Sequence, residues 1–328
     1  MRNKSQNGLR IATAVLGVML LALAGAAEPA VEGSFDRVLD VTGPVDLEVG
    51  SGSGSITVTT GAADVVRVVG KIRARSGGGF SAEEKVRRLE ESPPIDQRGN
   101  VIRIGEIMDH DLRRNVSISY ELVVPVETSL VSKTGSGSQQ IGDVRGPVEA
   151  ASGSGSLSLG NIGGDVEASA GSGSIEIDTV KGALEVSTGS GTIRAGGVAG
   201  PIESSSGSGS VEIEQTAPGD VEIETGSGSV RVSGVRGALN VDTGSGSIRA
   251  AGEPTGDWRL HAASGGVTLR LPSDVGFEIK ARTSSGSIES DHPITLVGRL
   301  SKRELRGAVR GGGHLLNIST SSGNIRIQ

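Results

Sequence analysis

The chain has 328 residues, of which 53 are glycine, and only 2% of the residues are aromatic. It contains no cysteine, which excludes disulfides, cysteine-ligated zinc and a cysteine nucleophile. The net charge of −6 and the scarcity of aromatic rings argue against nucleic-acid binding, which needs basic patches and stacking platforms.

The N-terminus has the three parts of a signal peptide. Residues 1–10 are basic, residues 11–25 are apolar, and Ala24 and Ala26 supply the small residues of a cleavage site. We therefore expect residues 1–26 to be cut off, with an uncleaved anchor as the alternative. Cleavage removes three basic residues and no acid, so the net charge falls to −9. The mature protein would have no stable membrane span and would lie in the periplasm, at the cell surface or outside the cell.

Residues 27–134 are expected to form an N-terminal β region. An early coil is predicted at "GSGSGSITV" (50–58), and a short helix is predicted at about 81–91. Ser81 and Glu84 form a capping box at the start of this helix. A helix in this place would cover the unpaired strands at the end of the β region.

From residue 135 onward a short motif returns at a nearly fixed interval. The tripeptide Gly-Ser-Gly begins at residues 135, 153, 171, 189, 207, 226 and 244, so every step but one is 18 residues long. A disordered linker has no reason to keep such an interval, whereas stacked repeats require it.

Each repeat contains two apolar pairs with a polar residue between the members, such as "IEI" (175–177) and "LEV" (184–186). This alternation predicts short strands with one face inward, and the glycine-rich corners predict sharp turns between them. We therefore predict an all-β protein with a single-stranded parallel β-helix of about 18 residues per coil over residues 135–328, in which the C-terminal coils are looser. The period does not determine the handedness.

Three segments resemble the bacterial putative-adhesin family, whose members are also called toast-rack domains. They are "VSISYELVVPVETSLVSKTGSGS" (116–138), "VTLRLPSDVGFEIKARTSSGSIES" (267–290) and "GGGHLLNISTSSGNIRIQ" (311–328). The resemblance implies a right-handed β-helix on an exported or membrane-tethered protein, close to envelope-stress functions. It supplies no catalytic residues.

Two columns of charged residues are predicted on the outside of the coils. One is an interaction stripe that stacks five glutamates: Glu149, Glu167, Glu185, Glu203 and Glu222. Because like charges in adjacent strands repel, the stripe is either an ordinary solvated face or a surface for cations or a basic partner. The other column alternates in sign over its first four members and would help to set the register: Glu176, Arg194, Glu212, Arg231 and Arg249.

Elsewhere the chain offers little that points to catalysis. Asp109, His110 and Asp111 are the polar group most like a catalytic cluster, and we interpret them as part of a loop. No set of residues has the spacing of a metal or cofactor site. We therefore expect no catalytic, cofactor-binding or metal-binding residues.

These features favour a non-catalytic extracytoplasmic β-helical scaffold or adhesin-like interaction module. Its partner would be a cell-envelope protein or a glycan, and its oligomeric state is left open. Two alternatives remain at this point: a carbohydrate-active β-helix enzyme and an envelope-stress-associated assembly component. The fold alone does not choose between them.

Overall fold

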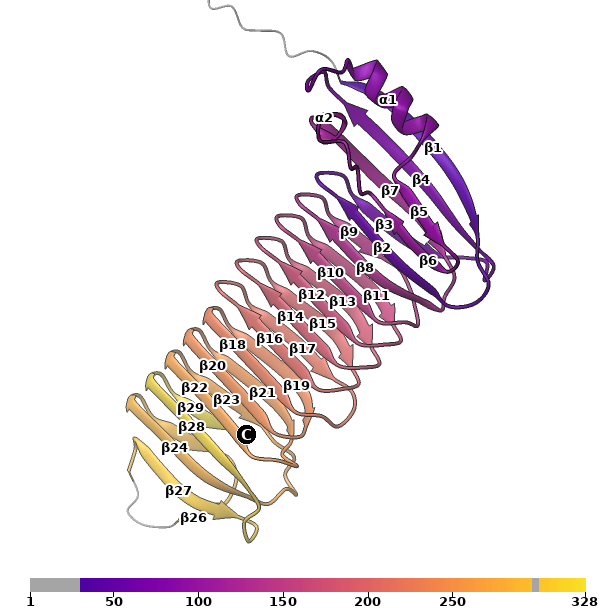
Figure 1. Ribbon diagram of the computed structural model, residues 1–328. Coiled ribbons are helices and arrows are strands. Elements are labelled where there is room, and N and C mark those ends of the chain that lie inside the picture. Colours follow the sequence, from indigo (N-terminus) through magenta and orange to yellow (C-terminus); the bar gives the residue numbers. More distant parts are fainter. Residues whose placement is uncertain (1–29, 297–300) are drawn as a thin grey trace, which may run out of the picture.

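The computed structural model describes residues 30–296 and 301–328, so the segment interpreted as a signal peptide lies outside the described residues. The described chain is an elongated solenoid built from two long β-sheets (Figure 1). Its regular secondary structure is almost all β-strand, with two short helices near the N-terminal end.

Both sheets run along the length of the solenoid. In spatial order, sheet 1 contains 14 strands: β1 (Val31–Asp40), β4 (Val65–Ala74), β7 (Val116–Val124), β3 (Ile56–Thr60), β9 (Gln139–Ile141), β11 (Leu157–Ile162), β13 (Ile175–Val180), β15 (Ile193–Val198), β17 (Val211–Gln215), β19 (Val230–Arg236), β21 (Ile248–Glu253), β23 (Val267–Arg270), β29 (Ile325–Ile327) and β25 (Ile288–Ser290). In spatial order, sheet 2 contains 15 strands: β26 (Thr295–Leu296), β27 (Glu304–Val309), β24 (Phe277–Ser285), β28 (His314–Ser322), β22 (Trp258–Ser264), β20 (Leu239–Ser245), β18 (Val221–Ser227), β16 (Ile202–Ser206), β14 (Leu184–Thr188), β12 (Val166–Ala170), β10 (Val148–Ser152), β8 (Thr128–Thr134), β2 (Val45–Ser51), β6 (Val101–Ile104) and β5 (Ile95–Arg98).

In the middle of the molecule, neighbouring strands of one sheet come from successive repeats. In sheet 2, Val148 pairs in parallel with Val166, and Val166 pairs with Leu184. In sheet 1, Ile175 pairs in parallel with Ile193. The predicted all-β fold with long parallel sheets is therefore confirmed.

The space between the sheets is filled by small and β-branched side chains. In β12, Val166 and Ala168 are buried, whereas Glu167 between them is exposed. This alternation repeats through the coils, so the outer face of each sheet is polar. Most parallel sheets have both faces covered by helices. In this solenoid the outer faces of the regular coils meet solvent along the described chain.

The Gly-Ser-Gly corners allow successive coils to approach closely. A Cβ atom on Gly171 would lie less than 3.0 Å from the carbonyl oxygen of Gly153 in the preceding coil, a separation that real Cβ atoms essentially never show. The backbone of these corner glycines lies outside the left-handed region. Glycine is therefore needed at these corners for close stacking and not for a positive φ.

A hydroxyl group directly before the corner holds it in place in the regular coils, except at Gly171, which Ala170 precedes. The Thr188 hydroxyl donates a hydrogen bond to the carbonyl of Gly173 in the preceding coil (3.0 Å) and accepts one from the Gly191 amide (3.1 Å). Ser152 makes the equivalent bonds, one to the preceding coil and one within its own corner. These hydroxyls satisfy backbone groups that the sharp corner would otherwise leave unpaired.

The early coil predicted at residues 50–58 is present. Strand β2 pairs with β8, and β3 pairs with β9, so residues 45–60 form one coil and the next begins at residue 128. The intervening residues add strands at the N-terminal end of both sheets. There β4 pairs antiparallel with β1 and β7, and β5 pairs antiparallel with β6.

The predicted helix is α1 (Ala82–Glu91), and a single turn, α2 (His110–Arg113), follows later. The Ser81 hydroxyl caps α1 by accepting a hydrogen bond from the Glu84 amide (3.2 Å). Val86 and Leu89 are buried in the core, and α1 packs against β1 and β4 at the N-terminal end of the solenoid (Figure 1). The helix therefore covers the last strands of sheet 1.

At the C-terminal end the spatial order of the coils differs from their order in the chain. The last strands of the chain, β28 and β29, lie between the coil of β22 and β23 and the coil of β24 and β25. An antiparallel hairpin of β27 with β24 and β26 completes sheet 2. The closing strand of the sequence is thus an internal strand of the structure.

We predict that Gly171→Ala lowers the free energy of unfolding by roughly 1–3 kcal/mol, because the added methyl group meets the backbone of the preceding coil. Gly52 holds the same corner position in the first coil, where a Cβ would have no atom within 4 Å. Gly52→Ala is therefore the matched control and should cost little. Urea unfolding of the two variants measures the difference, and equal losses would contradict the stacking argument.

The inserted position of β28 predicts slow amide exchange close to the end of the chain. Leu316 and Ile318 are fully buried, and each lies between two paired strands. Their amides should exchange about as slowly as that of Ile223 in the middle of the solenoid, although chain ends normally fray. Hydrogen exchange followed by mass spectrometry tests this, and rapid exchange throughout residues 314–322 would show that the strand is not held inside.

Candidate functional site

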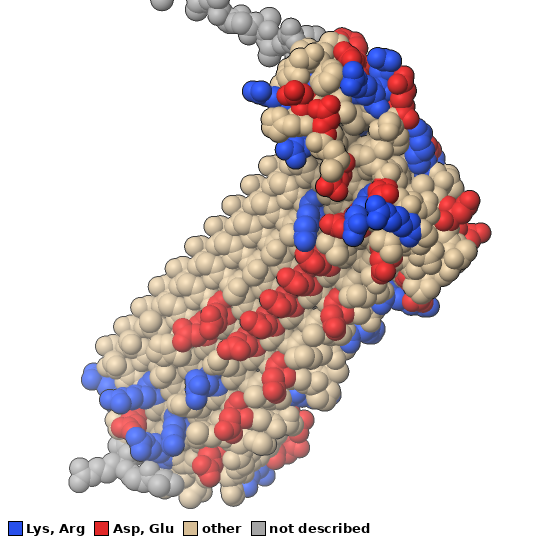
Figure 2. All heavy atoms as spheres, viewed as in Figure 1, with Lys and Arg blue, Asp and Glu red and all other residues tan. Residues whose placement is uncertain are grey.

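The five predicted glutamates form one column on the outer face of sheet 2. Glu149 pairs with Glu167, and each later member pairs with the next as far as Glu222. Neighbouring strands in a sheet are about 4.8 Å apart, so the carboxylates are stacked at that interval. Figure 2 shows a stripe of acidic side chains along the middle of the solenoid. We call these five residues the glutamate column.

Both ends of the glutamate column have a polar partner. At one end Lys133 Nζ lies 2.7 Å from a carboxylate oxygen of Glu149, and this hydrogen bond raises the pKa of the exposed Lys133. At the other end the Asn240 side-chain amide donates to Glu222 (3.0 Å). Between them lie three glutamates that have no ion pair within residues 30–296 and 301–328: Glu167, Glu185 and Glu203.

An open groove with a volume of about 1180 Å³ runs beside the glutamate column. The other side of the groove is formed by residues directly before the strands of sheet 2, which include Pro147, Asp165 and Pro201. Ten acidic residues and two arginines line this groove, so its potential is negative over most of its length. The acids are Asp46, Glu48, Glu149, Asp165, Glu167, Glu185, Glu203, Asp220, Glu222 and Asp257.

Three aspartates on this other side of the groove accept hydrogen bonds from backbone amides. Asp165 accepts from the Ala183 amide (2.8 Å) and Asp220 accepts from the Ala238 amide (2.9 Å), in each case one coil further on. Asp257 accepts in the same way from Leu315 (2.9 Å), which belongs to the inserted coil. These three carboxylates therefore tie coils together, whereas Glu167, Glu185 and Glu203 of the glutamate column have no ion pair among the described residues.

The alternating column lies on the outer face of sheet 1. Glu212 lies between two arginines, with separations of 3.8 Å to Arg194 and 3.1 Å to Arg231. Over the first four members of this column, attraction between neighbours thus replaces the repulsion found in the glutamate column. All these side chains are exposed, so the pairs contribute little to stability and mainly favour the correct register.

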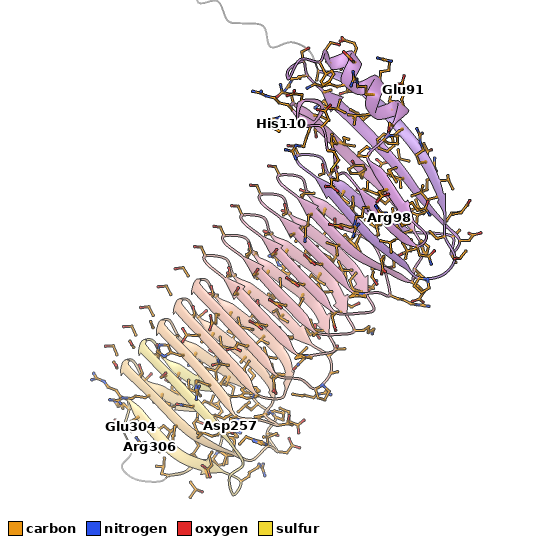
Figure 3. All side chains as sticks on the ribbon, in the orientation of Figure 1. Glu91, Arg98, His110, Asp257, Glu304 and Arg306 are labelled. Atoms are coloured by element: carbon orange, nitrogen blue, oxygen red, sulfur yellow. The ribbon has the colours of Figure 1, made fainter. Side chains whose placement is uncertain are left out.

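The group Asp109, His110 and Asp111 has a structural explanation. Asp109 caps α2 by accepting hydrogen bonds from the amides of Asp111 (2.9 Å) and Leu112 (3.1 Å). His110 is exposed and lies 3.7 Å from its neighbour Asp111. Figure 3 shows His110 near the N-terminal end, far from Asp257, Glu304 and Arg306 at the opposite end.

Sequence reasoning missed a basic surface at the C-terminal end of sheet 2. The inserted strand β28 places Asn317 between Arg259 and Lys280, and Arg306 pairs with Lys280 on the far side. In the next row, His261 Nδ1 and Ser319 Oγ are 2.9 Å apart. No local signal could have revealed this surface, because it exists only when β28 pairs out of chain order.

Within the described ranges, no group of three or more histidine, aspartate or glutamate side chains is arranged to hold a metal ion. Over the same part of the chain, no helix has the length and apolar character needed to cross a membrane.

A comparison with known protein families identifies the family of this chain. The family model Toastrack DUF4097 matches residues 146–328, which is more than half of the chain. The chain belongs to the Toastrack family. The Toastrack match includes the whole glutamate column and the C-terminal coils. No curated protein matches the chain.

Several solved structures match the Toastrack chain over most of its length. A putative cell adhesion protein from Clostridium sporogenes ATCC 15579 is 12% identical, with 90% of this chain and 98% of that one covered and a TM-score of 0.24. A putative adhesin from Bacteroides fragilis NCTC 9343 is 12% identical, with 90% and 97% covered and a TM-score of 0.35. A putative lipid binding protein from Parabacteroides distasonis ATCC 8503 is 11% identical, with 90% and 97% covered and a TM-score of 0.42. At such identities and TM-scores, these similarities carry no argument about function.

The two charged columns predict opposite effects of the same substitution. Glu203→Gln removes a charge that lies between two like charges, so it should raise the melting temperature at low ionic strength. Glu212→Gln removes a charge that lies between two arginines, so it should lower the melting temperature. We expect shifts of roughly 1 °C, as is typical of exposed charges. Both shifts should disappear in concentrated salt. Thermal unfolding in dilute solution tests this, and shifts of the same sign would contradict the column geometry.

Proposed function

We propose that this Toastrack chain is a non-catalytic, extracytoplasmic scaffold with an adhesin-like role, and that the outer face of sheet 2 is its interaction surface. The observation that carries the proposal is the acidic groove beside the glutamate column, which forms a continuous surface along the regular coils. Its unpaired carboxylates are held on a rigid two-sheet frame, so a partner need not order them from a flexible loop.

We also propose that the frame is a right-handed solenoid with about 18 residues per coil. Parallel pairs such as Glu149 with Glu167 and Glu167 with Glu185 support the coil length. Connections between parallel strands of one sheet are right-handed in about 98% of cases, which supports the handedness.

The negative charge of the groove favours binding of a basic partner over a catalytic role. Glycosidases need two carboxyl groups in different environments, because one must stay protonated as the acid while the other is ionised. The members of the glutamate column instead repeat one environment, in which exposed carboxylates lie side by side on a polar face. This arrangement suits attraction of a basic surface better than acid–base chemistry.

The proposal predicts that binding to cell envelopes depends on the outer face of sheet 2. Glu167→Gln, Glu185→Gln and Glu203→Gln together should weaken co-sedimentation of the mature protein with envelope fractions of the source cells. The matched control is Glu176→Gln, Glu212→Gln and Glu214→Gln, which makes the same change of charge on the outer face of sheet 1. This control should bind like the wild type.

Three readouts bear on the same proposal. The mature protein in those fractions is expected to begin at Ala27, and a chain that begins at Met1 would contradict cleaved export. Equal binding by both triple variants would reject sheet 2 as the interaction surface. Cleavage of a glycan by the wild type that is lost in the sheet 2 variant would replace the scaffold proposal with the carbohydrate-active alternative.

A further inference from the structure

The outer face of sheet 2 carries opposite charges on its two halves. In spatial order, the column that contains the glutamates continues beyond Glu222 through Asn240, Arg259, Asn317, Lys280 and Arg306. The first half of the column is therefore acidic and the second half is basic or donates hydrogen bonds. Figure 2 shows basic side chains grouped toward the C-terminal end of the face that bears the acidic stripe.

A second column, which lies two residues further along the parallel strands, is acidic near the middle of the sheet and ends in one arginine and one glutamate. In spatial order it reads Ser187, Ser205, Glu224, Asp242, His261, Ser319, Arg282 and Glu304. Within the described residues, Arg259, Lys280 and Arg282 have no carboxylate partner, whereas Arg306 lies 2.8 Å from Glu304. The acidic half and the basic half thus both present charges that are not neutralised by other described residues.

We infer that this face is homophilic: two copies of the chain associate through their sheet 2 faces, related by a two-fold axis that runs parallel to the strands between β20 and β22. The inference deepens the proposed function, on which it rests, by naming the partner as a second copy of this chain.

The contacts that this axis creates follow from the spatial order of the strands. An axis between β20 and β22 places β18 over β28, β16 over β24, and β14 over β27 of the other copy. Glu203 then faces Lys280 of the second copy, and Glu185 faces Arg306 of the second copy. Near the axis, Asn240 faces Arg259 of the second copy.

The second column is complementary under the same operation. Asp242 faces His261 of the second copy, Glu224 faces the Ser319 hydroxyl, and Ser205 faces Arg282. No pair of like charges is brought together in either column. A two-fold axis along the solenoid would instead place the acidic coils of one copy over those of the other, so the charges select the axis parallel to the strands.

The area of the overlapping face is that expected of a weak dimer. Eight strands, from β14 to β27 in spatial order, take part in the overlap. At about 4.8 Å per strand and about 3.3 Å for each of five residues, they offer on the order of 600 Å² per copy. A standard protein interface has roughly 800 Å² per partner. Because the contacts are mostly exposed charges, the dimer should form at low ionic strength and dissociate as salt is added.

The test uses two charge-reversal variants of the mature protein. The acid-reversed variant carries Glu185→Lys and Glu203→Lys, and the base-reversed variant carries Lys280→Glu and Arg306→Glu. All four residues are exposed on the outer face, so the fold should be retained, and thermal unfolding verifies this. Sedimentation velocity at low ionic strength measures the mass of each species.

The inference predicts a dimer for the wild type and at least a tenfold weaker association for each variant alone, roughly as expected for opposed charge pairs. An equimolar mixture of the two variants should form a heterodimer, because reversed acids then face reversed bases. All four substitutions in one chain should restore the homodimer. The control Glu176→Lys with Glu214→Lys, which makes the same change of charge on sheet 1, should remain dimeric.

A wild type that stays monomeric at low ionic strength would overturn the inference, as would variants that remain dimeric alone or fail to associate when mixed. These results are separate from the test of the proposed function. Envelope binding by a monomeric wild type, lost in the Glu167, Glu185 and Glu203 variant, would reject only the homophilic partner. A dimer that has no affinity for envelopes would reject only the envelope role.

Discussion

The close approach of one backbone to the next at the glycine corners is the constraint on which the whole solenoid depends. A side chain at Gly171 would meet the carbonyl of Gly153, so the corner admits only glycine. At other corners, such as those that follow Ser152 and Thr188, the hydroxyl before the glycine bonds to the preceding coil. This stacking fixes the register between coils. The register then decides which residues share the core and which share a column on the surface.

A fixed register turns one residue of a repeat into a line of identical groups. On the inner face this produces a continuous apolar core from short strands that would be unstable alone. On the outer face it produces the glutamate column, in which repulsion accumulates, and the alternating column, in which it is relieved. The polar outer faces also keep two exposed parallel sheets from associating through apolar contacts. Any contact between copies must therefore be made by charge and hydrogen bonding.

The ends of the solenoid need separate devices, because the repeat cannot protect its own terminal strands. At the N-terminal end, α1 packs on the last strands of sheet 1. Its Glu90 side chain accepts a hydrogen bond from the Ser34 amide (2.9 Å) on the edge strand β1. At the C-terminal end, the hairpin of β27 with β24 and β26 ends sheet 2. Neither device repeats the sequence of the regular coils.

Much of the fold could be predicted from the sequence, because the repeat carries its own signals. The interval between corners, the alternation around Glu167 and the capping box at Ser81 each depend on residues close together in the chain. The basic half of sheet 2 could not be predicted in this way. Its residues, such as Arg259, Asn317 and Lys280, become neighbours only because β28 pairs between β22 and β24. Similar coils offer similar pairing surfaces, so no local pattern tells which one a strand will join.

The insertion of β28 and β29 makes the order of synthesis matter for closing the solenoid. Until residues 314–328 have been synthesised, the strands of residues 277–309 have no coil on which to dock, because β24 pairs with β28 and not with β22. A chain that stops before them would therefore end in two open sheet edges, which are surfaces prone to pair with other chains and to aggregate. The solenoid can thus close at this end only after its inserted coil has been made.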